Sequence, residues 1–76
     1  MIIRWEEGFE IHASAGQGAA VITANRAGLR SLAMQLRDLA DAAPGSHIHY
    51  DEYNSLEEGS CELIFVKARD AEPAEA

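Results

Sequence analysis

The distribution of apolar residues predicts one amphipathic helix in the middle of the chain. Over residues 25–45 the apolar positions recur at the spacings that place them on one helix face. Asn25 suits the N-cap, because its side-chain oxygen can accept a free backbone N–H of the first turn. Pro44 and Gly45 are expected to end the helix, because proline has no N–H and disfavours helical angles in the preceding residue. The predicted apolar face consists of Leu29, Leu32, Ala33, Leu36, Leu39, Ala40 and Ala43, whereas Arg30, Gln35, Arg37, Asp38 and Asp41 fall largely off it.

The segments before the helix predict short β-strands. Residues 1–5 are rich in β-branched and aromatic side chains, and a turn signal that ends in glycine follows at 6–8. Residues 9–13 alternate between apolar and polar side chains, so these two stretches are expected to form a hairpin. Residues 14–19 are small and contain glycine, which predicts a loop. Residues 20–24 are compatible with a third strand.

The segments after the helix predict two more strands. Residues 46–50 alternate again, residues 51–60 form a polar connection, and residues 61–68 form the last strand. The simplest way to bury one helix stripe and one sheet face is a two-layer α+β fold. We expect the helix to cross an antiparallel sheet of four or five strands in the order ββ(β)αββ. A single domain is expected over 1–68, followed by a disordered acidic tail at 69–76 without apolar periodicity.

Alternation also predicts which side chains of the last strand face the helix. Burial of Glu62 would be costly, so Leu63 and Phe65 should meet the helix, and Ile64 and Val66 should lie on the open face. Exposed apolar residues of this kind often mark association surfaces, which predicts a homodimer or a partner here. The alternative is that the acidic connection or the tail covers them. The same open face is expected to carry Ile2, Arg4, His12, His47 and His49.

The composition describes a small and strongly acidic protein. The chain has 76 residues and a net charge of −7, from 13 acidic and 6 basic side chains. This balance argues against nucleic acid or an anionic membrane as a partner, and it favours either a basic protein partner or simple solubility. The single cysteine, Cys61, excludes an internal disulfide and fits a cytoplasmic location. Because Glu6 and Glu7 interrupt the first apolar run, no signal peptide is expected.

A metal site is one candidate chemistry. His47 and His49 share one side of a predicted strand, and Asp51 would extend that side. Together with His12 they would offer imidazole and carboxylate ligands of the kind that zinc or manganese accepts. The His-x-His spacing is also common in solvated strands, so histidines without a metal are the favoured interpretation. No cofactor is predicted.

Catalysis finds less support. A chain this short offers little concavity to hold paired carboxylates across a substrate. Cys61 is expected to be a buried or half-buried apolar residue on the helix side, away from the histidines. The Gly-Gln-Gly at 16–18 lacks the Gly-Lys-Ser/Thr ending of a phosphate loop. The sequence therefore predicts a protein that is not an enzyme.

Binding is the best supported class. Residues 51–62 hold five carboxylates and no lysine or arginine. Carboxylates steer and orient a basic partner, and tyrosine is enriched in interface hot spots. The alternative is a connection whose acids simply lie in water. The predicted partner-binding residues are Tyr50, Asp51, Glu52, Tyr53, Glu57 and Glu58.

Residues 25–67 resemble the immunity protein 32 family. The matching elements are a GLxxLAxxLxxLA helix, an H-x-H strand, and the motif DEYNSLEEGS before an ELI strand. The motif after the helix is more specific than the leucine pattern. The resemblance implies a small cytoplasmic protein of a bacterial polymorphic-toxin system that binds and neutralises its cognate toxin. Charge alone suggests a basic nuclease as that toxin. A self-associating homodimer and a small metal-binding protein remain the alternatives.

Overall fold

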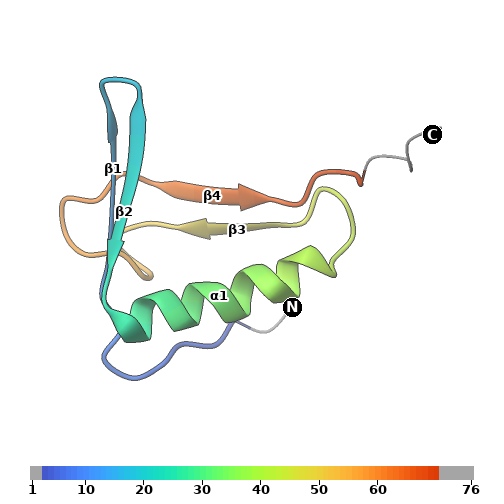
Figure 1. Cartoon of the computed structure of the whole chain (residues 1–76), viewed down its shortest axis with the longest axis horizontal. Helices are drawn as coiled ribbons and strands as arrows, with labels where there is room; N and C mark the ends of the chain where they lie inside the picture. Colours follow the sequence, from blue (N-terminus) through green and yellow to red (C-terminus); the bar gives the residue numbers. More distant parts are fainter. Residues whose placement is uncertain (1–2, 71–76) are drawn as a thin grey trace.

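The computed structural model describes residues 3–70 and has an α+β fold, as the sequence predicts. Its strands form two separate antiparallel hairpins and not one sheet of four or five strands. The first hairpin precedes the helix and stands across the direction of the second, which lies beside the helix (Figure 1). The elements in chain order are β1 (Ile11–Gly16), β2 (Ala19–Ala24), α1 (Arg26–Ala40), β3 (His47–Tyr50) and β4 (Leu63–Val66).

The first hairpin forms where the sequence predicted a loop. Strands β1 and β2 pair from Ile11 opposite Ala24 to Gly16 opposite Ala19. Only two residues connect them, and both have positive φ angles, 53° at Gln17 and 80° at Gly18. Two such residues make the type I′ turn, whose twist matches that of the flanking strands. The predicted loop at 14–19 is therefore wrong, whereas a strand over 20–24 is confirmed.

The N-terminal segment does not pair as a strand. Residues 3–6 have no regular secondary structure and run along the helix, and residues 1 and 2 lie outside the described residues. The backbone N–H of Glu6 donates to Ser31 Oγ at 2.8 Å, and Gln35 Nε2 donates to the carbonyl of Arg4 at 2.7 Å. Helix side chains thus satisfy backbone groups that a neighbouring strand would otherwise bind. The predicted hairpin of residues 1–5 with 9–13 is wrong.

The helix begins as predicted and ends earlier. Asn25 Oδ1 accepts the N–H of Gly28 at 2.8 Å, which confirms Asn25 as the N-cap. At the other end, the N–H of Asp41 already turns back to the carbonyl of Asp38. Gly45 takes no part in the helix terminus, because its N–H donates to the carbonyl of Lys67 beside β4. The helix therefore stops at Ala40, and residues 41–46 form the connection to β3.

The buried face of α1 is rotated from the predicted one, because the helix packs against the N-terminal segment as well as the strands. Leu29 is 55% exposed, whereas Gln35, expected off the apolar face, is fully buried. Burial of Gln35 is compatible with stability because both of its polar atoms have hydrogen-bond partners. The buried residues of α1 are Gly28, Ser31, Leu32, Gln35 and Leu39.

Gly28 allows the helix to approach the base of the first hairpin. A Cβ atom at this position would lie 2.5 Å from the carbonyl oxygen of Glu10 and 2.9 Å from Cγ1 of Ile11. It would also lie 3.1 Å from the Cβ of Ala24. Glycine is unfavourable inside a helix, so its presence here is explained by this close contact.

The second hairpin supplies much of the core. Strands β3 and β4 pair from His47 opposite Val66 to Tyr50 opposite Leu63. One face is exposed, with Ile64 at 51% and Val66 at 61%, whereas Leu63 and Phe65 pack against the core, which confirms the predicted alternation. Around Tyr50, the rings of Trp5 and Phe65 form edge contacts at 6.0 and 5.9 Å. The buried apolar cluster consists of Ile11, Ala13, Leu32, Leu39, Ile48, Tyr50 and Leu56.

The connection between β3 and β4 joins the two hairpins. The N–H of Glu57 donates to the carbonyl of Ile11 at 2.8 Å, and the N–H of Cys61 donates to that of Ala13 at 2.9 Å. Ser60 Oγ also accepts the N–H of Ala13 at 3.1 Å. This connection therefore occupies the edge of β1 that does not face β2. Within residues 3–70, no helix has the length and apolar character needed to cross a membrane.

Candidate partner-binding surface

The acidic loop, residues 51–62, is an ordered structure built on Asp51. The carbonyl of Asp51 accepts the N–H groups of Asn54, Ser55 and Leu56 at 2.9–3.3 Å. The side-chain oxygen Oδ1 of Asp51 also accepts the N–H of Tyr53 at 2.9 Å and that of Asn54 at 3.0 Å. A side chain that binds backbone groups two and three positions ahead fixes a turn. Leu56, only 5% exposed, then anchors the middle of the loop in the core.

The second half of the loop is held by its own chain and by β1. Glu52 Oε2 accepts the N–H of Gly59 at 2.8 Å and so bridges the loop. Gly59 has a φ of 89°, a conformation that glycine adopts without the steric cost of a Cβ. The bond from Glu57 to Ile11 fixes this half against the first hairpin. The backbone of the loop is therefore held at both halves.

This framework exposes one aromatic ring and several carboxylates. Tyr53 is 91% exposed, and Glu52, Glu57 and Glu58 are exposed as well. A shallow hollow of about 350 Å³ is lined by Glu52, Tyr53 and Glu58. The loop thus offers a negative surface with an apolar centre, the combination that suits a basic protein partner.

Tyr50 has a different place from the other predicted contact residues. It is 1% exposed, and its hydroxyl donates to Gln35 Oε1 at 2.6 Å. Burial raises the pKa of Tyr50 to about 12, because the phenolate would lose its hydration. Its buried side chain offers almost no surface to a partner. The alternation that placed Tyr50 on the side of Ile48, away from the histidines, already carried this signal.

The histidines do not gather at one point. Among the described residues, His49 is the one histidine that lies in a group of potential ligands, together with Asp51 and Glu62. Their donor atoms are within 4.8 Å of one another. His49 Nε2 lies 3.3 Å from a Glu62 oxygen, and both side chains are well exposed. His47 lies at the start of β3, opposite Val66, and His12 belongs to the first hairpin. Within residues 3–70 the predicted set of three histidines therefore does not form a ligand cluster.

Cys61 lies outside the strand whose alternation was used to place it. β4 begins only at Leu63, and Cys61 is exposed with a free thiol. The prediction of a buried or half-buried cysteine is wrong, because its segment follows the edge of β1 and not the pleat of β4.

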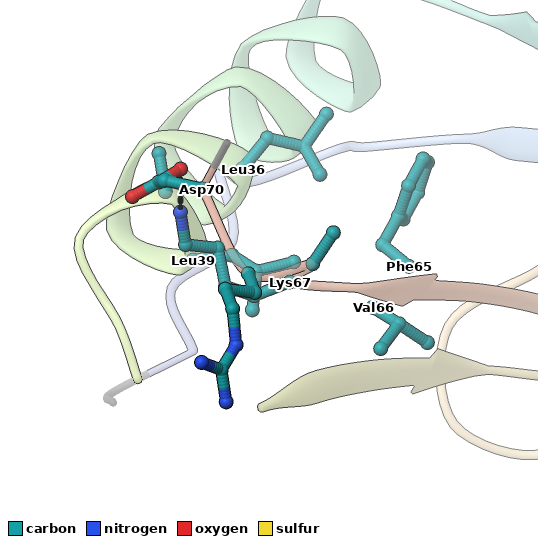
Figure 2. A pocket seen from close by; sticks show the side chains of 9 residues that line it. Leu36, Leu39, Phe65, Val66, Lys67 and Asp70 are labelled. Atoms are coloured by element: carbon teal, nitrogen blue, oxygen red, sulfur yellow. Dashed lines mark hydrogen bonds and ion pairs between the residues drawn. The ribbon is translucent and has the colours of Figure 1, made fainter. Parts of the chain in front are cut away.

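A second hollow lies at the far end of β4, beside the helix. It has a volume of about 410 Å³ and is lined by residues including Leu36, Leu39 and Phe65. Figure 2 shows Phe65 and Val66 on opposite sides of the strand, and the Lys67–Asp70 ion pair at the rim. That pair spans 2.7 Å, so the two charged groups neutralise each other. The hollow thus combines apolar contacts with the charged residues Lys67, Arg69 and Asp70.

The comparisons with known proteins identify a family. The model of the family described as Immunity protein 32 matches residues 20–68, which is more than half of the chain. That range contains β2 except for Ala19, the helix, the acidic loop and both strands of the second hairpin. Searches of curated proteins and of solved structures gave no match. The family match confirms the resemblance in the sequence, and the chain belongs to the Immunity protein 32 family.

Proposed function

We propose that this protein binds and neutralises a cognate bacterial toxin through its acidic loop. The observation that carries the proposal is an ordered loop that exposes Tyr53 and three glutamates, two of which, Glu52 and Glu58, line a hollow with Tyr53. Membership of an immunity protein family supports a role in immunity. We further propose that neutralisation occurs in the cytoplasm by binding alone, without catalysis.

The charge of the molecule supports a basic partner. The net charge is −7, and residues 51–62 concentrate five of the 13 acidic side chains without a lysine or arginine. Such a surface accelerates encounter with a positively charged partner and disfavours acidic ones. A basic toxin, such as a nuclease whose own substrate is anionic, fits this surface.

The loop residues divide into contacts and supports. Tyr53 is the proposed central anchor, because its exposed ring can be buried at little entropic cost. Glu57 and Glu58 are proposed ion-pair partners at its side. Glu52 is proposed to contribute charge while it holds Gly59. Asp51 is proposed to act by shaping the turn, since its carboxylate already accepts two backbone N–H groups.

The test separates charge at the loop from charge in general. A Glu57→Lys, Glu58→Lys double variant reverses two exposed carboxylates that accept no hydrogen bond within residues 3–70. The control, Glu7→Lys with Asp41→Lys, makes the same change in net charge at exposed positions elsewhere. The toxin is first captured from a lysate of the source organism with the wild-type chain as bait. Its affinity for each variant is then measured by calorimetry.

The proposal predicts that the loop variant loses affinity by about a hundredfold or more, because two ion pairs become repulsions. The control should keep its affinity within about threefold at physiological salt. Cells that produce the toxin should survive with the control variant and die with the loop variant. Equal affinity of the two variants for the toxin would reject the acidic loop as the binding surface.

Self-association is a second candidate function, and the exposure of Ile64 and Val66 favours it. These side chains are 51% and 61% exposed on the outer face of the second hairpin. If two copies bury this face, Ile64→Asp should convert a dimer to a monomer in light scattering. An unchanged mass would remove this face from consideration.

A further inference from the structure

Within residues 3–70 the outer edge of β2 has no partner strand, and β2 contains no charged residue. Its six residues bond to β1 on one side, and within residues 3–70 no other segment pairs with the opposite side. Val21 is 51% exposed and Ile22 is 39% exposed. Natural proteins protect such edges with charges, proline or bulges, because open edges pair with other chains. β2 carries none of these protections.

The hydrogen bonds of β1 show which backbone groups of β2 are open. Ile11 and Ala13 direct their backbone groups away from β2, toward the acidic loop. Residues opposite each other in an antiparallel pair point their backbone groups either both inward or both outward. Ala24 and Ile22 stand opposite these two residues, and Ala20 continues the alternation. The N–H and C=O groups of Ala20 and Ile22 therefore face away from β1.

The charge distribution selects the partner for this edge. Residues 11–25 form the longest stretch of the chain without aspartate, glutamate, lysine or arginine. Two copies, each with a net charge of −7, can approach here without placing carboxylates against each other. A basic partner finds no countercharge on this strand. The outer face of β3–β4 is less suited to a second copy, because Glu62, His47 and His49 place polar and charged groups beside its apolar residues.

We infer that β2 pairs antiparallel with β2 of a second copy, which makes one four-stranded sheet across a two-fold axis. Val21 would stand opposite Val21 of the second copy, with their side chains in contact on one face. Ala20 and Ile22 would then exchange backbone hydrogen bonds with Ile22 and Ala20 across the axis. The pairing uses the free edge of both copies, so the assembly closes as a dimer and does not extend. It goes beyond the proposed toxin binding and does not depend on it.

The test is the mass in solution, measured by sedimentation equilibrium on the full chain over a range of concentrations. The wild type is expected at twice the chain mass. Val21→Glu places two carboxylates opposite each other at the axis and should raise the dimer dissociation constant by about tenfold or more. The matched control is Thr23→Glu, on the same face and equally charged. Its two carboxylates would lie about 13 Å apart, so it should remain dimeric.

A second variant tests the backbone pairing itself. Ile22→Pro removes an N–H that faces away from β1, so the first hairpin keeps its own hydrogen bonds while the dimer loses two. Circular dichroism confirms that each variant is folded. The inference is supported if Val21→Glu and Ile22→Pro are monomers and Ile64→Asp is a dimer. A monomeric wild type, or a dimer that only Ile64→Asp disrupts, would overturn it.

Discussion

The two hairpins of this small protein differ in how they are supported. β3–β4 has one face in the core, with Ile48 and Tyr50 buried along its length. β1–β2 is buried only at its base, at Ile11 and Ala13, and its turn projects beyond β4 (Figure 1). Both are antiparallel, yet only the base of the first hairpin joins the core, and its outer half forms an exposed arm. Burial against the core, and not strand pairing, distinguishes the two hairpins.

The connections within the two hairpins also differ, in length and in charge. A turn of two residues, Gln17 and Gly18, closes the first hairpin, whereas residues 51–62 connect the strands of the second. The long connection is acidic, ordered by Asp51 and anchored by Leu56, while the short hairpin is uncharged. The stable region thus carries the proposed toxin contacts, and the arm carries the proposed contact with a second copy.

Truncation of matched isoleucines should show the largest difference. Ile48 in β3 is 6% exposed, and Ile48→Ala should lower the free energy of unfolding by about 2–5 kcal/mol, because it leaves a cavity. Ile22 in β2 is 39% exposed, and Ile22→Ala should cost about 1 kcal/mol or less. Urea unfolding followed by circular dichroism, at a concentration where the chain is monomeric, measures both. Equal losses would mean that the arm belongs to the core.

The joint between the arm and the helix should be the next most sensitive position. Gly28→Ala places a Cβ 2.5 Å from the carbonyl oxygen of Glu10, so the helix must move away from the hairpin base. We expect a loss of about 1–3 kcal/mol in spite of the better helix propensity of alanine. A rise in the melting temperature would contradict the close contact.

Loss of the buried Tyr50 hydroxyl in the second hairpin should have a smaller effect on stability, with a distinct pH dependence. Tyr50→Phe leaves Gln35 Oε1 without its donor and should cost about 1–3 kcal/mol. The pKa of Tyr50 rises from 10.0 to about 12 on folding, so its protonated form is favoured in the folded state. The folded state is fully stabilised below pH 10, and this stability should decline as pH rises from about 10 to about 12.

Denaturant unfolding between pH 8 and 12 checks this expectation. Tyr50→Phe should lose the part of the decline that belongs to this hydroxyl. Tyr53→Phe provides the control, because Tyr53 is 91% exposed and should change stability little. If Tyr50→Phe kept the same pH profile as the wild type, burial of Tyr50 would not be the cause of the decline in stability.

Loss of the helix cap should give the smallest effect. Asn25 accepts N–H groups of Gly28 and Glu10 and donates to the carbonyl of Gly8. Asn25→Ala should cost about 0.5–2 kcal/mol, and Asn25→Asp should recover part of it by capping the helix. Thermal melting measures the stability of the wild type and of both variants. An alanine variant as stable as the wild type would show that these bonds do not tie the arm to the helix.

Features set by adjacent residues were the ones that the sequence could predict. Asn25 caps the helix because its bonding partner lies three residues away. Alternation, together with the cost of burying Glu62, placed Ile64 and Val66 on the open face. The type I′ turn was missed because Gln17 at a positive φ replaces the usual asparagine. Helix termination was misplaced because Gly45 bonds to Lys67, a partner distant in sequence.

Features set by partners distant in sequence could not be predicted from the sequence. Ser31 and Gln35 are buried because they bind the backbone of the N-terminal segment, which no periodicity reveals. The division into two sheets follows from the acidic loop, which occupies the free edge of β1 through Glu57 and Cys61. Exposure of the glutamates followed from composition, whereas the role of Asp51 in shaping the loop needed the hydrogen bonds themselves.

Hydrogen exchange on the complex with the captured toxin tests the central claim most directly. We predict that amides of residues 52–58 become protected in the complex, while those of β2 show the same protection with and without toxin. Protection of β2 or of the turn at Gln17, with the acidic loop unchanged, would contradict the account and assign toxin binding to the arm.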